Sequence, residues 1–77
     1  MDKDDVMALV GKVLAGIAPE ADLAGVGDDE DLRAALDLDS MDFLNLIIGL
    51  SQGSGMAIAE KDYPKLFTIK GIQDFLS

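Results

Sequence analysis

Asp39, Ser40, Met41 and Asp42 stand together where an acidic stretch of the sequence gives way to an apolar one. Paired carboxylates beside a hydroxyl could do general acid–base chemistry, as in a hydrolase. The same four residues also form an ordinary helix start. In that interpretation Asp39 caps the helix, and Asp42 follows three residues later as a capping-box partner.

Most residue types that catalysis needs are missing. The 77 residues include no Cys, His or Trp, which excludes a disulfide, a thiolate zinc site, a thiol nucleophile and a Ser–His couple. A carboxylate pair would need a cleft that separates its two pKa values, and a chain this short has little room for one. We therefore expect a protein that is not an enzyme.

An EF-hand calcium loop does not fit either. Such a loop needs acids or amides at positions 1, 3 and 5, and a glutamate at position 12. A loop starting at Asp37 puts Met41 at position 5 and Ile48 at position 12, and one starting at Asp29 puts Arg33 at position 5. We expect no specific metal site.

Negative charge is concentrated in one part of the chain. The formal net charge is −9, and residues 20–42 contribute −8 of it, from nine acids and the single base Arg33. Such a run is either a solvated loop or an electrostatic docking surface around residues 39–42. The charge argues against nucleic acid and anionic membranes and favours partners with basic patches.

Apolar periodicity predicts an all-α fold, a three- to four-helix bundle with a long first loop, in one domain over residues 1–77. No apolar run approaches the ~20 residues that span a membrane, and no signal peptide is evident, so we expect a cytoplasmic monomer. The expected elements are helices over 5–18, 40–52 and 69–76, a connection over 19–38 with a short helical turn at 30–36, an extended link at 57–59 and one turn at 60–66.

The stretch from Leu36 to Leu46 resembles the prosthetic-group attachment site of acyl carrier proteins. In that family an Asp-Ser-Leu motif opens the second helix, and the serine carries 4′-phosphopantetheine. Here Asp39 and Ser40 match the motif, Met41 replaces its leucine, and Asp42 matches a common acid after it. The order and spacing of the other elements also match across most of the chain.

The resemblance implies that Ser40 carries phosphopantetheine covalently, with Asp39 and Met41 completing the attachment motif. A phosphopantetheinyl transferase would attach the group from coenzyme A with Mg²⁺, and its arm would supply the thiol that this chain lacks. Partners would be acyl or aminoacyl ligases, synthases and transferases with basic docking patches, in fatty-acid or specialised acyl metabolism. The expected docking residues are Asp37, Asp39, Asp42 and Phe43.

Several departures from the family pattern keep alternatives open. Asp37 stands where many members have glycine, and Asn45, Ser51 and Gln52 stand where fatty-acid carriers often have acids. The Asp-Ser-Met variant is also similar to carriers charged with an amino acid by a dedicated ligase. An alternative from another class is a small acidic adaptor in which Ser40 is only a helix cap. The apolar residues that follow Met41 are expected mainly in the core, with an acyl-sequestering cavity as the alternative.

Overall fold

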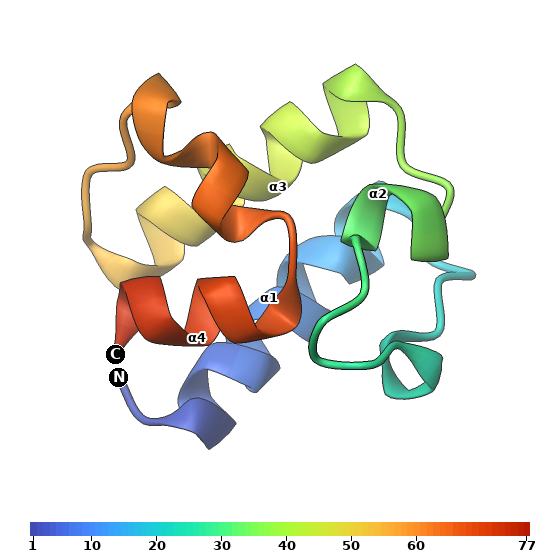
Figure 1. Ribbon diagram of the computed structural model, residues 1–77, viewed down its shortest axis with the longest axis horizontal. Helices are drawn as coiled ribbons and strands as arrows, with labels where there is room; N and C mark the ends of the chain where they lie inside the picture. The colour runs from blue at the N-terminus through green and yellow to red at the C-terminus, as the bar shows by residue number, and fades with distance from the viewer.

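The computed structural model describes residues 1–77, and all of its regular structure is helical (Figure 1). The all-α class predicted from the sequence is therefore confirmed. In chain order the elements are α1 (Lys3–Ile17), the 3₁₀ turn η1 (Leu23–Gly25), α2 (Leu32–Ala35), α3 (Ser40–Ser54), the 3₁₀ segment η2 (Glu60–Leu66) and α4 (Ile69–Leu76).

Helix α1 begins two residues earlier than predicted because Asp2 caps it. The Asp2 carboxylate accepts a hydrogen bond from the Asp5 amide at 2.8 Å, which satisfies one of the free N–H groups of the first turn. The helix ends at Ile17, since Ala18 precedes Pro19 and takes a non-helical backbone (ψ 82°). Its buried face consists of Val6, Val10 and Leu14.

The long connection between α1 and α3 is more ordered than a loop. The predicted helical turn is present as α2, whereas η1 was not predicted. Two backbone hydrogen bonds attach the connection to the junction of η2 and α4: Leu32 N donates to Phe67 O (2.7 Å), and Lys70 N donates to Asp28 O (3.0 Å). Leu32 is fully buried, so the acidic segment is held against the bundle by an apolar anchor as well.

Helix α3 continues to Ser54, so the predicted end at Gln52 is wrong. Gly53 lies inside the helix, and its lack of a Cβ lets Leu9 of α1 approach closely. The terminator is Gly55, which takes the left-handed conformation (φ 73°) that favours glycine. Helices α1 and α3 pack against each other along this contact.

The chain closes with η2 and α4, which have the predicted bounds. Thr68 caps α4 as expected, accepting a hydrogen bond from Gly71 N at 3.0 Å. Helix α4 packs on α1, and the two termini lie side by side (Figure 1), where the Met1 amino group donates to Leu76 O. One core of thirteen apolar side chains joins all four α-helices and η2. None of the helices has the length and apolar character needed to cross a membrane.

Candidate functional site

The start of α3 is built by a reciprocal capping box. Asp42 N donates to Asp39 Oδ1 at 2.8 Å, and Asp39 N donates to Asp42 Oδ2 at 3.3 Å. The capping interpretation of these two acids is therefore confirmed. Because Asp39 is the N-cap, Ser40 is the first residue inside the helix and is not the cap.

The hydroxyl of Ser40 differs from those of the other three serines. Ser51 Oγ donates to Met56 O at 2.8 Å, Ser54 Oγ donates to Leu50 O at 2.6 Å, and Ser77 Oγ donates to Asp74 O at 3.4 Å. The exposed Ser40 hydroxyl has no hydrogen bond within the protein. It lies at the positive end of a fifteen-residue helix, where a negatively charged group is stabilised.

A hollow of about 720 Å³ opens beside Ser40, between α2, α3 and η2. Arg33 is the only basic residue that lines it. The guanidinium stacks on the Phe67 ring at 3.6 Å and donates to both carboxylate oxygens of Asp31, from Nε at 3.1 Å and Nη2 at 2.7 Å. The hydrogen bond from Arg33 lowers the pKa of Asp31 and raises the pKa of Arg33 itself.

Phe43 does not lie where a docking residue must. It is only 7% exposed and packs edge-on against Tyr63 (6.4 Å between ring centroids) and Phe67 (5.3 Å). The expected docking role of Phe43 is not supported by this position, and we assign its side chain to the core. The apolar pattern of residues 40–52 could not show which face of the helix is buried.

A strip of exposed apolar side chains runs along α3 from the residue after Ser40. Met41 is 64% exposed, Leu44 36% and Ile48 45%, at the spacing of one helix face. The other large apolar residues of α3 (Phe43, Leu46, Ile47 and Leu50) are buried, so the expectation of core positions is confirmed for most of them. The spacing of Met41, Leu44 and Ile48 was visible in the sequence, but not their exposure.

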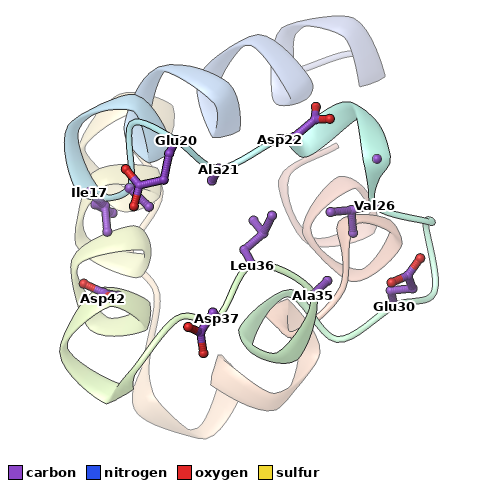
Figure 2. A pocket seen from close by; sticks show the side chains of 12 residues that line it. Ile17, Glu20, Ala21, Asp22, Val26, Glu30, Ala35, Leu36, Asp37 and Asp42 are labelled. Carbon is purple, nitrogen blue, oxygen red and sulfur yellow. The ribbon is translucent and has the colours of Figure 1, made fainter.

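Of the remaining expected docking residues, Asp39 lines the hollow beside Ser40 together with Arg33, whereas Asp37 and Asp42 do not. Asp37 and Asp42 line a second hollow, shown in Figure 2, together with acids from the α1–α2 connection. Asp37 is exposed and takes the left-handed backbone conformation (φ 54°), in which aspartate is tolerated and glycine is unstrained. No group of three or more acidic side chains converges closely enough to hold a metal ion.

Comparison with known proteins decides the family. No protein-family model matches the chain. Over all 77 residues, however, it is 30% identical to the polyketide-8 synthase acyl carrier protein 2 of Streptomyces avermitilis, and the match covers 83% of that relative. The chain belongs to the acyl carrier protein family. The resemblance read from the attachment motif is thereby confirmed, and so is the acyl-carrier-like helical bundle.

As an acyl carrier protein, the chain has a carrier role rather than an enzymatic one. Membership of this family implies, in general terms, interaction with synthase partners and a transferase. The family normally carries phosphopantetheine. The start of α3 fits this group, because Ser40 offers an exposed hydroxyl with no competing hydrogen bond at a helix N-terminus. The sequence marked Arg33 as the lone base in the acidic segment but did not indicate that it lines the hollow beside Ser40.

Proposed function

We propose that this acyl carrier protein carries an acyl group as a thioester on 4′-phosphopantetheine attached to Ser40. The observation that supports the proposal most strongly is that the helix start is capped without the Ser40 hydroxyl. Asp39 and Asp42 satisfy the helix end between them, and the Ser40 hydroxyl stays exposed and unbonded. An adaptor in which Ser40 is only a helix cap does not agree with that arrangement.

In the proposed attachment, Ser40 Oγ forms a bond to the phosphorus that bears the pantetheine chain of coenzyme A. The phosphoanhydride bond of coenzyme A breaks, and the adenosine bisphosphate leaves. The hydroxyl proton passes to a base of the transferase. The Ser40 and Met41 amides of the first turn have no acceptor within the protein, so they would be available to the resulting phosphodiester.

Partner enzymes would meet two kinds of surface around Ser40. The carboxylates of Asp37, Asp39 and Asp42 form an acidic docking surface at the loop and helix start, which suits partners with basic patches. The exposed strip of Met41, Leu44 and Ile48 adds an apolar contact along α3. We propose that residues 1–77 work as one carrier domain and as a cytoplasmic monomer, supported by their single core and by the self-repulsion of a net charge of −9.

The missing cysteine makes a direct test possible. After incubation with coenzyme A, Mg²⁺ and a broad-specificity phosphopantetheinyl transferase, the desalted protein should contain one thiol per chain, as measured with a thiol-reactive dye. Ser40→Ala should contain none, and Ser77→Ala, which removes another exposed hydroxyl, should contain one. A thiol that appears in Ser40→Ala, or none in the wild type, contradicts the proposal.

The docking surface has its own test. Asp39→Asn keeps a side-chain oxygen for the Asp42 amide but removes the charge, so a slower modification reports on electrostatics and not on a lost cap. At low ionic strength the double variant Asp39→Asn and Asp42→Asn should be modified about threefold to tenfold more slowly, and added salt should narrow its difference from wild type. The acid Asp74 on α4 supplies the control Asp74→Asn, whose rate should match wild type. Equal rates for the double variant and wild type contradict the electrostatic part of the proposal.

A further inference from the structure

The four methionines of this chain differ in their access to solvent. Met41 is 64% exposed, Met1 44% and Met56 38%, whereas Met7 is half-buried and packs against the core. The chain contains no cysteine, so methionine sulfur is the group that a peroxide oxidises most readily here. Because the peroxide must reach the sulfur from solvent, Met41 should react first.

Met41 also lies beside the proposed attachment site. It is the second residue of α3, directly after Ser40, whereas Met56 follows the other end of the same helix, about 20 Å away along the helix axis. Helical side chains lean toward the N-terminus of their helix, so the Met41 side chain covers the end of α3 at which Ser40 lies. A partner that reaches the Ser40 hydroxyl therefore meets the Met41 side chain as well.

The fold does not depend on the Met41 side chain. It belongs neither to the buried core nor to the apolar residues packed against that core. Buried residues such as Leu46 and Leu50 hold α3 in place, and the carboxylates of Asp39 and Asp42 cap its first turn. A change of polarity at the Met41 sulfur should therefore alter the surface beside Ser40 and leave the fold intact.

We propose that Met41 is a redox-sensitive modification site, at which oxidation to methionine sulfoxide by hydrogen peroxide weakens docking of the phosphopantetheinyl transferase. A lone pair of the thioether sulfur attacks one peroxide oxygen, so that the S–O bond forms and the O–O bond breaks. The other oxygen leaves as water. The sulfur loses two electrons, and the peroxide gains them. The consequence for docking rests on the proposed function, whereas the site of oxidation does not.

The sulfoxide would change the end of the apolar strip nearest Ser40. That strip consists of Met41, Leu44 and Ile48, all exposed along one face of α3. Oxidation turns the flexible apolar side chain of Met41 into a polar one. Its oxygen would be buried against an apolar partner surface without a donor, which should raise the KM of the transferase for the carrier about tenfold.

The first experiment uses the chain before it is modified, because the thiol of an attached arm would itself react with peroxide. After treatment with hydrogen peroxide and removal of the excess with catalase, peptide mass spectrometry locates each added oxygen. Met41 should gain one oxygen before the other methionines do. Oxidation of Met7 or Met56 ahead of Met41 would overturn the proposal.

The second experiment measures the KM of the transferase for protein oxidised only at Met41. It should be about tenfold higher than for the untreated protein, and sulfoxide reductases for both epimers, supplied with a thiol reductant, should restore it. Thermal unfolding should be the same before and after oxidation, since the side chain is exposed. An unchanged KM, or a lowered Tm that accounts for the loss, would overturn the proposal.

Two matched variants assign the effect to one sulfur. Met41→Leu and Met56→Leu each replace one exposed methionine by an apolar residue of similar volume that has no sulfur. Peroxide should leave the KM of Met41→Leu at its value before treatment, and should raise the KM of Met56→Leu as it does in the wild type. A peroxide-dependent rise in Met41→Leu would assign the effect to another methionine and contradict the inference.

The outcomes separate this inference from the proposed function. If the untreated wild type is not modified at Ser40, the proposed function fails, and the role of Met41 in docking fails with it. If the untreated wild type is modified and oxidation of Met41 leaves the KM unchanged, the proposed function stands and only the present inference fails.

Discussion

Replacing Asp39 and Ser40 separately tests whether the Ser40 hydroxyl contributes to the stability of the fold. Asp39→Ala removes the acceptor that binds Asp42 N at 2.8 Å and should lower the free energy of unfolding by about 1 kcal/mol. Ser40→Ala removes a hydroxyl that has no hydrogen bond, so its effect should stay within about 0.5 kcal/mol of zero. Asp39→Asn retains the acceptor. The variant loses the attraction between the carboxylate and the helix dipole, but it also loses the repulsion between Asp39 and Asp42. Its free energy of unfolding should therefore be close to that of the wild type.

These differences are large enough to measure in a domain of this size. A change of 1 kcal/mol corresponds to roughly 4–8 °C in Tm for a chain of 60–100 residues, and urea unfolding followed by circular dichroism gives the free energies directly. The expected order of stability is wild type, Ser40→Ala and Asp39→Asn close together, with Asp39→Ala well below them. If Ser40→Ala loses as much stability as Asp39→Ala, the hydroxyl is part of the cap and the reasoning is refuted.

Three further predictions concern the rest of the fold. Gly71→Ala should lower the free energy of unfolding by several kcal/mol, because its Cβ would meet the carbonyl of Lys65. Gly11→Ala has open space around the new Cβ and should raise the free energy of unfolding by about 0.5–1 kcal/mol. Equal effects in urea unfolding would contradict this packing. Leu46→Ala, at a fully buried position, should cost about 2–5 kcal/mol, and comparable loss from truncating an exposed α3 leucine would contradict the assigned buried face. Arg33 lowers the pKa of Asp31 below 3.8. The ion pair should therefore stabilise the fold fully above pH 3.8 and progressively less as the pH falls through the lowered pKa. An NMR titration that places the pKa of the Asp31 carboxyl at or above 3.8 would contradict this prediction.

The sequence predicted the elements whose signals are local. Thr68 followed by apolar residues at helical spacing placed α4 correctly, and Pro19 placed the end of α1 within a residue. The capping partners Asp39 and Asp42 were also evident, since a capping box is defined by residues three apart. At these positions tertiary contacts agree with local preference, so local reasoning is enough.

Features that depend on distant parts of the chain could not be predicted. Gly53 read as a helix terminator because its contact with Leu9 of α1 is invisible in the local sequence. Phe43 read as a docking residue because an apolar run does not say which face is covered. The hollow lined by Asp37 and Asp42 brings together Ile17 of α1, Leu36 just after α2 and Asp42 of α3, so their proximity appears only in the folded chain (Figure 2).

The central claim is that one hydroxyl of this chain, that of Ser40, accepts a phosphopantetheinyl group. Intact mass spectrometry after incubation with coenzyme A, Mg²⁺ and the transferase tests it most directly, with fragmentation to locate the added mass. We predict a gain of one phosphopantetheinyl group on the peptide that contains Ser40, and none in Ser40→Ala. A gain that persists in Ser40→Ala, or that maps to another serine, would contradict the account, as would an unchanged mass for the wild type.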